Sequence, residues 1–333
     1  MNTPGTPATP AKRTLVTGGA GFIGSHLVDL LLARGDEVVV VDNLSTGRRE
    51  NLPTLHPRLR FVHADLSVFL AAEGAGLRFD RAFHLAAAVG VKLVMDEPVR
   101  SIETNVGQTA ALLEYALTHG PAGGPVPVLI ASSSEVYGKS EKCPFAEDDD
   151  VVYGPTSKGR WSYAASKAID EYLALAHHAK HALPVVIARF FNTVGPRQVG
   201  EYGMVLPRFV SAAVAGQDLL VHGDGGQSRC LCDVRDVVPA VAALLEAPEC
   251  RGRVFNVGSD RPISVLDLAR RVIAVLSSSS RVRCVPYNEV YSKGFEDLRR
   301  REPDLRRIRS AIGFEPRIGL DQTIRDLAAS VRS

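Results

Sequence analysis

Short apolar runs rich in β-branched residues alternate with longer helical patterns over the first half of the chain. Segments such as 23–34 and 99–119 follow the strand-like runs, and their apolar residues recur at helical spacing. This alternation is typical of a parallel sheet with helices on both faces, because each crossover between parallel strands needs a helix. The pattern therefore predicts a doubly wound α/β fold with strands at 14–17, 38–42, 60–63, 82–85, 128–132 and 185–189.

The pattern changes after Asn192. Glycines and prolines become more frequent, and short strand-like pieces alternate with helical patterns at 205–215, 234–246 and 265–276. We interpret this region as a smaller C-terminal lobe packed beside the sheet. The predicted organisation is a flexible leader at 1–12, a sheet domain at 13–192 and the lobe at 193–333, with room for the chain to cross between the last two.

Composition and charge narrow the class of protein. The 333 residues are 45% hydrophobic and 23% charged, which is enough apolar material for a packed core. Lys and Arg number 39 against 37 Asp and Glu, and a net charge of +2 favours neither nucleic acid nor a membrane surface as a partner. The five cysteines lack the spacing of a zinc site or a disulfide framework, and no apolar run reaches the roughly 18 residues of a membrane helix. We expect a cytoplasmic protein without a metal.

A glycine-rich turn follows the first predicted strand. Gly18, Gly21 and Gly24 stand between the run at 14–17 and a helical segment. Glycines at these positions permit a tight turn and let free backbone N–H groups approach a pyrophosphate closely. The strand before the turn and the helix after it make the motif specific. The sequence thus predicts that 13–192 is a Rossmann domain.

An acid at the end of the second strand indicates which dinucleotide binds. Asp42 lies eighteen residues after Gly24, where a carboxylate bonds the ribose 2′-hydroxyl of NAD and repels the 2′-phosphate of NADP. Arg48 and Arg49 are close enough in sequence to hold such a phosphate instead. Asp65, after the third strand, is a candidate partner of the adenine amino group. We expect NAD as the cofactor.

Tyr163 and Lys167 lie four residues apart near the start of a helical segment, so they share one face of it. A nearby ammonium stabilises a phenolate, and the lysine is therefore expected to lower the pKa of the tyrosine so that it can act as a base. This spacing is common by chance, but it gains support from the dinucleotide turn and from the serine-rich strand end at 132–134. Ligands of open α/β sheets bind at such strand ends.

Several motifs in order resemble the extended short-chain dehydrogenase/reductases, and among them the nucleotide-sugar epimerase/dehydratase group. The resemblance implies catalysis by Ser133, Tyr163 and Lys167 on a nucleoside-diphosphate sugar, most simply a UDP-sugar, while tightly held NAD takes a hydride from C4 and returns it. It also implies a homodimer, for which the helices at 99–119 and 162–180 are candidates. The motifs are TGGAGFIGSHL (17–27), HLAA (84–87), SSSEVYG (132–138), YAASK (163–167), RFFNTVGPR (189–197) and GDGGQSR (223–229).

The same resemblance implies further binding residues. For NAD they are Phe22, Ile23, Asn43, Leu66, Leu85, Ala86 and Ala87, with Tyr163 and Lys167 contacting it as well. The resemblance assigns the lobe at 193–333 to binding of the nucleotide-sugar substrate. The residues implied for this substrate are Val89, Lys92, Ser134, Asn192, Arg208, Val221, Arg229 and Arg301. The arginine-rich stretch at 299–309 also contains acids, which argues against nucleic acid as its partner.

Glu135 bears on what happens to the 4-keto sugar. The resembling decarboxylases and 4,6-dehydratases commonly have glutamate at this position, whereas the 4-epimerases have a small or hydroxyl residue. A carboxylate there could move a proton near C5 or C6, or it could simply pair with a neighbouring Arg or Lys. We therefore include Glu135 with Ser133, Tyr163 and Lys167 among the candidate catalytic residues.

Other segments divide between two reactions. GPTSKGRW (154–161) and QSRC (227–230) resemble UDP-glucuronate decarboxylases, in which oxidation at C4 creates a β-keto acid that loses carbon dioxide without a strong base. GPRQ (195–198) and YGMVLPR (202–208) resemble UDP-sugar 4-epimerases more closely. The sequence is most like the decarboxylases. A 4-epimerase, a 4,6-dehydratase and a non-catalytic dinucleotide sensor are the alternatives.

Overall fold

The structure is a computed structural model that describes residues 11–87, 97–200, 204–290 and 299–332. A seven-stranded parallel sheet of order β11-β6-β5-β4-β1-β2-β3 forms its centre. All six predicted strands are confirmed, with ends that differ by one residue at most. The seven strands of the sheet, in chain order, are β1 (Arg13–Thr17), β2 (Glu37–Asp42), β3 (Leu59–His63), β4 (Arg81–His84), β5 (Val128–Ser133), β6 (Val185–Phe190) and β11 (Arg253–Val257).

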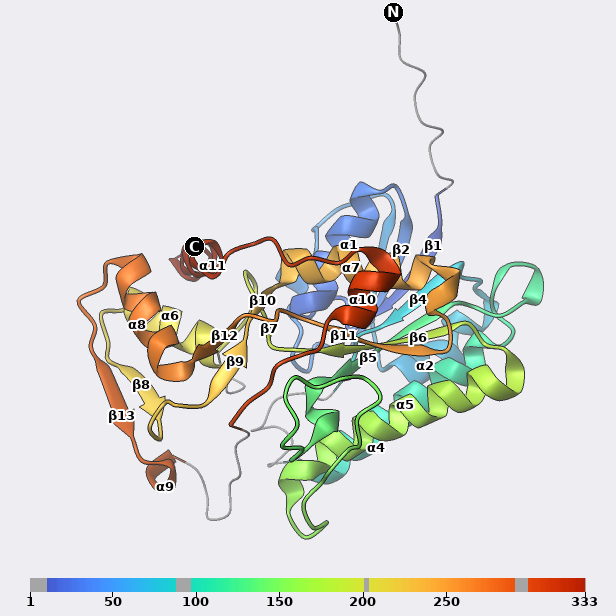
Figure 1. Cartoon of the computed structure of the whole chain (residues 1–333). Helices are drawn as coiled ribbons and strands as arrows, with labels where there is room; N and C mark the ends of the chain where they lie inside the picture. The colour runs from blue at the N-terminus through green and yellow to red at the C-terminus, as the bar shows by residue number, and fades with distance from the viewer. Residues whose placement is uncertain (1–10, 88–96, 201–203, 291–298, 333) are drawn as a thin grey trace, which may run out of the picture.

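Helices cover both faces of this sheet (Figure 1). Their apolar sides form two separate cores, one on each face, as a doubly wound sheet requires. One face carries α1 (Phe22–Ala33), α7 (Val234–Glu246) and α10 (Arg306–Ile312), and the other carries α2 (Leu66–Ala71), α4 (Pro98–Ala116) and α5 (Ser162–His181). The predicted fold class is confirmed.

The seventh strand, β11, lies within 193–333, the range that the sequence predicts to form the second lobe. β11 pairs in parallel with β6, and α7 packs against α1. Parallel strands can be distant in sequence, so local periodicity does not show which sheet a short apolar run will join. The chain therefore leaves the sheet after β6, returns for α7 and β11, and returns again for α10.

The second lobe has a core of its own, formed mainly by the apolar faces of three helices. These helices are α6 (Val205–Val214), α8 (Val265–Leu276) and α11 (Leu320–Arg332). Its short strands form the pairs β8 (Leu219–His222) with β13 (Val282–Val285) and β9 (Ser228–Cys230) with β12 (Pro262–Ser264), while β7 (Thr193–Val194) pairs with β10 (Cys232–Asp233). The remaining elements are α9 (Tyr287–Val290) and the 3-10 turns η1 (Arg49–Asn51), η2 (Glu73–Gly76), η3 (Pro121–Gly123), η4 (Ser134–Tyr137), η5 (Gly159–Trp161) and η6 (Pro248–Cys250).

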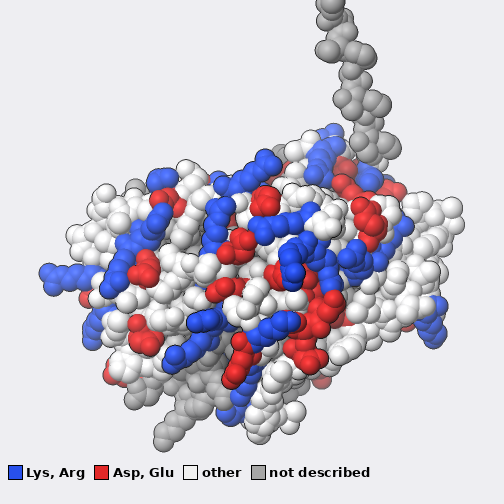
Figure 2. Space-filling view, in the orientation of Figure 1, with Lys and Arg blue, Asp and Glu red and all other residues white. Residues whose placement is uncertain are grey.

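The surface agrees with the balanced composition. Lys and Arg side chains are interspersed with Asp and Glu side chains over the face shown in Figure 2. Among the described helices, not one is both long enough and apolar enough to cross a bilayer. All five cysteines are free.

Candidate active site

A cavity of about 730 Å³ lies between the carboxyl ends of the central strands and the second lobe. Its walls include Gly18 after β1, Ser133 at the end of β5 and Arg208 on α6. Carboxyl ends of neighbouring parallel strands meet at one edge of a sheet, which explains why residues far apart in sequence share this cavity. Its volume lies within the range of small-molecule and cofactor sites.

The glycine turn has the shape that a dinucleotide needs. Gly18 adopts φ +68°, and a Cβ on Gly24 would lie 2.1 Å from the Gly18 carbonyl oxygen. Side chains are therefore excluded from both positions. Within the described chain no side chain caps the first turn of α1, whose N-cap is Gly21. The backbone N–H groups of that turn face a cavity that Gly21 itself lines, so a pyrophosphate fits there.

Asp42 lies at the end of β2 and lines the same cavity. Its Oδ2 accepts a hydrogen bond from the Ala20 N–H at 2.9 Å, and its Oδ1 accepts one from the Leu44 N–H at 2.8 Å. Burial raises the pKa of this carboxyl, and the two N–H donors oppose the rise. Asp42 thus braces the glycine turn while presenting an acid to the cavity, and this fits NAD.

The two arginines that could favour NADP differ in whether they line the cavity. Arg48 lines the cavity. Arg49 instead donates to the carbonyl oxygens of Leu52 and Pro53 and lies over the Phe61 ring. One of the two arginines that the sequence brought near Asp42 is therefore committed elsewhere.

Almost all the predicted NAD residues line the cavity. Asp65 does so while it accepts a hydrogen bond from Asn43 Nδ2 at 2.7 Å. Lys167 does not line it. The predicted residues on its walls are Gly18, Gly21, Phe22, Ile23, Gly24, Asp42, Asn43, Asp65, Leu66, Leu85, Ala86, Ala87 and Tyr163.

Ser133 and Tyr163 meet beside this site. Ser133 ends β5 and caps η4, where its hydroxyl accepts from the Glu135 N–H at 3.2 Å. Tyr163 lies in the first turn of α5, and its phenol forms a hydrogen bond with the Ser133 hydroxyl. The two groups can therefore bond one substrate oxygen together.

The expected effect of Lys167 on the tyrosine is wrong in this structure. The pKa of Tyr163 is raised, first by burial and then by the negative charge of Glu135, whereas the bond from Ser133 lowers it. Lys167 is 2% exposed, and its Nζ lies 2.7 Å from Asp170 Oδ2. The spacing placed both residues on α5 correctly, but a buried aspartate one turn further holds the ammonium.

Glu135 forms a buried cluster with two arginines. Its Oε2 lies 2.7 Å from Arg160 Nη2, and its Oε1 lies 2.5 Å from Arg301 Nη1. Burial alone would raise the pKa of Glu135, but the charges of Arg301 and Arg160 outweigh it and the pKa is lowered. Two cations and one anion leave the cluster with a net charge of +1. The Nε atoms of both arginines are buried and have no partner among the described residues.

Arg160 was not among the predicted site residues. It lies in η5, just before α5, and it lines the cavity together with Glu135 and Arg301. Arg160 lies in the stretch GPTSKGRW (154–161), whose resemblance to the decarboxylases pointed to this segment but to no individual residue in it. Glu135 therefore pairs with arginines, as the alternative interpretation expected, and these arginines belong to the cavity wall.

Some of the other predicted substrate residues line the cavity and others do not. Ser134, Asn192, Arg208 and Arg229 line the cavity, and the buried Asn192 Nδ2 has no partner within the described part of the chain. Val221 is buried in the core of the second lobe, away from the cavity wall. Val89 and Lys92 lie outside the described residues.

Two unpredicted residues of the second lobe also line the cavity. His222 Nε2 lies 2.9 Å from Arg208 Nη1, and Gln227 Nε2 donates to the His222 carbonyl oxygen at 3.1 Å. These contacts fix part of the wall on the lobe side. The described residues contain no group of three His, Cys, Asp or Glu side chains that could hold a metal ion.

Comparison with known proteins gives one family. Residues 14–258 match the NAD dependent epimerase/dehydratase family. The chain is 40% identical to the UDP-N-acetyl-alpha-D-glucosaminuronate decarboxylase of Bacillus cytotoxicus, over 95% of this chain and 96% of that protein. It is 34% identical to UDP-glucuronic acid decarboxylase 1 of Arabidopsis thaliana, over 96% of this chain and 70% of the relative.

A solved structure agrees in fold. The UDP-glucose 4-epimerase of Thermotoga maritima, determined with UDP-glucose, superposes with a TM-score of 0.84. It is 30% identical, and the match covers 96% of this chain and 98% of that one. The arrangement of sheet and lobe is therefore shared with a protein that was solved with a nucleotide sugar.

Proposed function

The chain belongs to the NAD dependent epimerase/dehydratase family, and from that premise we propose that it decarboxylates a UDP-hexuronate through a transient 4-keto sugar. The observation that supports decarboxylation is the cluster of Glu135, Arg160 and Arg301. Its net charge of +1 and the position of all three side chains on the cavity wall suit a substrate that brings a carboxylate of its own. The relatives named as decarboxylases support the same reaction.

Each residue of the site has its own role in the proposed reaction. NAD, when bound, accepts the hydride of sugar C4 and later returns it. Tyr163 accepts the proton of the 4-hydroxyl at its phenol oxygen, and Ser133 donates a hydrogen bond to the sugar oxygen as it becomes a carbonyl. A carboxylate at C5 is then β to a ketone, so the C5–C6 bond breaks and releases carbon dioxide without a strong base. The electron pair of that bond passes into the C4 enolate, which takes a proton from water at C5, and Tyr163 returns its proton to the oxygen at C4 when the hydride comes back.

The raised pKa of Tyr163 sets a condition on this step. Burial and the charge of Glu135 both disfavour the phenolate, and they raise the pKa of this phenol. The hydrogen bond from Ser133 works in the opposite direction. Tyr163 can accept a proton only after a change in its surroundings favours the phenolate, and the positive nicotinamide ring of NAD⁺ would supply such a change.

Incubation with three UDP-sugars tests the proposal. UDP-glucuronate, UDP-N-acetylglucosaminuronate and UDP-glucose are each supplied with NAD⁺, while carbon dioxide and sugar products are followed by NMR. We expect carbon dioxide and a UDP-pentose from an acidic sugar, and the better acidic substrate shows whether C2 carries a hydroxyl or an acetamido group. Epimers at C4 with C6 intact would instead show the 4-epimerase, which the likeness to the Thermotoga protein favours as second candidate.

We propose further that the protein is a homodimer in which α4 and α5 of two copies form a four-helix interface. These two helices pack side by side, and apolar side chains on them are exposed: Val99, Ile102, Ile169 and Tyr172. An apolar patch on a soluble protein is commonly covered by a partner. The mass in solution, measured by light scattering for the wild type and for Tyr172→Glu, tests the interface. A monomeric wild type would exclude it.

The cytoplasm is the proposed location. The free state of all five cysteines supports it, since reducing conditions keep thiols unpaired. Cell fractionation with an antibody to the native protein tests this directly, and recovery from an oxidising compartment would contradict it.

A further inference from the structure

We propose that Asn256 is a positioning residue that holds Arg301 against Glu135. Asn256 lies on β11, is fully buried, and does not line the cavity. The inference rests on the proposed function, because it concerns the cluster that we assign to the substrate carboxylate. Asn256 acts through the backbone segments that carry the two charged partners.

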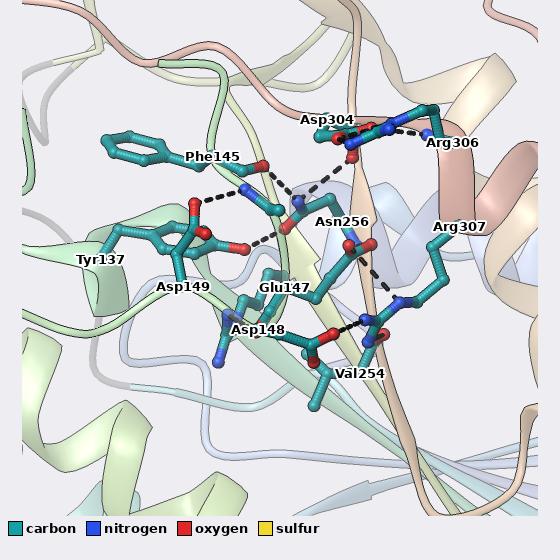
Figure 3. Close-up of polar contacts among 12 residues, drawn as sticks. Tyr137, Phe145, Glu147, Asp148, Asp149, Val254, Asn256, Asp304, Arg306 and Arg307 are labelled. Carbon is teal, nitrogen blue, oxygen red and sulfur yellow. Dashed lines mark hydrogen bonds and ion pairs between the residues drawn. The ribbon is translucent and has the colours of Figure 1, made fainter. Parts of the chain in front are cut away.

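The side chain of Asn256 joins three segments (Figure 3). Its Oδ1 accepts from the Tyr137 hydroxyl at 2.7 Å, and its Nδ2 donates to the carbonyl oxygens of Phe145 at 2.9 Å and Asp304 at 3.3 Å. Its backbone N–H donates to Glu147 Oε1 at 2.9 Å. A buried amide with these partners uses both donors and its acceptor, which fixes its orientation.

One of these contacts leads to Glu135. Tyr137 follows it by two residues in the same 3-10 turn, so a bond at the tyrosine hydroxyl fixes the turn that presents the carboxylate. The Tyr137 ring stacks on Phe145 at 4.6 Å with an interplanar angle of 6°, and Arg189 lies 4.7 Å from its centroid on the β6 side. The turn is therefore held through its aromatic side chain.

Another contact leads to Arg301. This arginine lies between 299 and 305, where the chain forms neither a helix nor a long strand. Its neighbours make a parallel bridge with Phe145, whose N–H donates to the Glu302 carbonyl at 2.8 Å and whose carbonyl accepts from the Asp304 N–H at 2.8 Å. Asn256 Nδ2 donates to both carbonyls that frame this bridge. The position of the Arg301 backbone thus depends on the amide, and its guanidinium reaches Glu135 from there.

Two substitutions separate the two connections. Asn256→Asp keeps the acceptor for Tyr137 but turns an oxygen toward the carbonyls of Phe145 and Asp304, so it disturbs the Arg301 side. Tyr137→Phe removes a single hydroxyl and disturbs the Glu135 side. Tyr115→Phe is the matched control, because its buried hydroxyl donates to Gly74 O at 2.8 Å, away from the cavity walls.

A double-mutant cycle with Arg301→Gln measures whether Asn256 acts through the arginine. We expect Asn256→Asp to lower kcat/KM for the acidic UDP-sugar by about tenfold in the wild type and by less than about twofold in the Arg301→Gln background. Tyr137→Phe should also lower kcat/KM, whereas Tyr115→Phe should leave it unchanged. Binding of the same UDP-sugar to the NAD-loaded protein, measured by calorimetry, gives a second cycle that needs no turnover.

The outcomes are distinct. The double variant would show the product of the two single losses, in kcat/KM and in affinity, if Asn256 and Arg301 acted independently. That result would show a general structural role for Asn256 and overturn the inference. Release of no carbon dioxide by the wild type would refute the proposed function, and the calorimetric cycle would still decide whether Asn256 acts through Arg301. If Asn256→Asp does not fold, Tyr137→Phe in the Glu135→Gln background tests the other connection of Asn256, through Tyr137 to Glu135, and equal losses in both backgrounds overturn the inference.

Discussion

Replacement of Glu135 by glutamine removes the charge between Arg160 and Arg301 while it preserves the shape of the side chain. The exposed fractions of the three side chains are 13%, 9% and 10%, so water screens the cluster only slightly. Removal of one partner of a buried ion pair leaves an uncompensated charge, which costs about 3–5 kcal/mol. We expect the free energy of unfolding at pH 7 to fall by about 3 kcal/mol, at the lower end of that range, because the amide oxygen can still accept one bond.

The dependence of this loss on pH follows from the lowered pKa of Glu135. Arg301 and Arg160 outweigh burial and favour the charged carboxylate in the folded protein. A lowered folded-state pKa contributes stability that is complete above the unfolded value of about 4.3 and disappears as pH falls through the folded value. The difference in unfolding free energy between the wild type and Glu135→Gln should therefore shrink as the pH is lowered below about 4.

Urea denaturation of the NAD-loaded protein measures both effects. Glu37→Gln is the matched control, because Glu37 pairs with Arg13 on the surface, where the exposed fractions are 54% and 47%. An exposed pair of this kind contributes at most about 1 kcal/mol. If Glu135→Gln were no less stable than Glu37→Gln at pH 7, the Glu135 carboxylate would not be a buried anion that stabilises the fold by pairing with Arg160 and Arg301.

Three further predictions concern Tyr163, Asp170 and Asp42. Tyr163→Phe should lower kcat by about 10²–10⁴-fold while NAD affinity, measured by calorimetry, stays unchanged, since it removes the proton acceptor alone; an active variant would exclude the tyrosine as base. Asp170→Asn should leave Lys167 as a buried ammonium without its counter-ion and lower the free energy of unfolding by about 3 kcal/mol; urea curves that match the wild type would contradict this, and Asp170→Glu should restore part of the loss. Asp42→Ala should weaken NAD binding by about 1.5–3 kcal/mol, the contribution of a hydrogen bond to a charged group, and calorimetry with NAD and NADP would contradict the assignment if neither affinity changed.

The sequence by itself determined the elements and the dinucleotide turn. Alternating strand and helix periods predicted six strands of the sheet, because the side-chain period of an element is a local property. The positive φ of Gly18 and the close approach of Gly24 to the Gly18 carbonyl are local requirements, so the spacing of the glycines indicated the turn, although Leu85 and Ala86 also leave no room for a side chain at Gly18. The i, i+4 relation likewise placed Tyr163 and Lys167 on one helix.

The tertiary structure decided which charges meet. Glu135 pairs with Arg160 of η5 and with Arg301 of the segment at 299–305, and both partners lie at separations that no local pattern encodes. Lys167 bonds Asp170 and so leaves the pKa of Tyr163 to burial and to Glu135. In the same way, β11 joins the sheet only when the chain has crossed the second lobe and returned. Coulombic interactions and desolvation depend on distance and burial in three dimensions, so residue types and spacing named most of the candidate side chains while the fold assigned their partners.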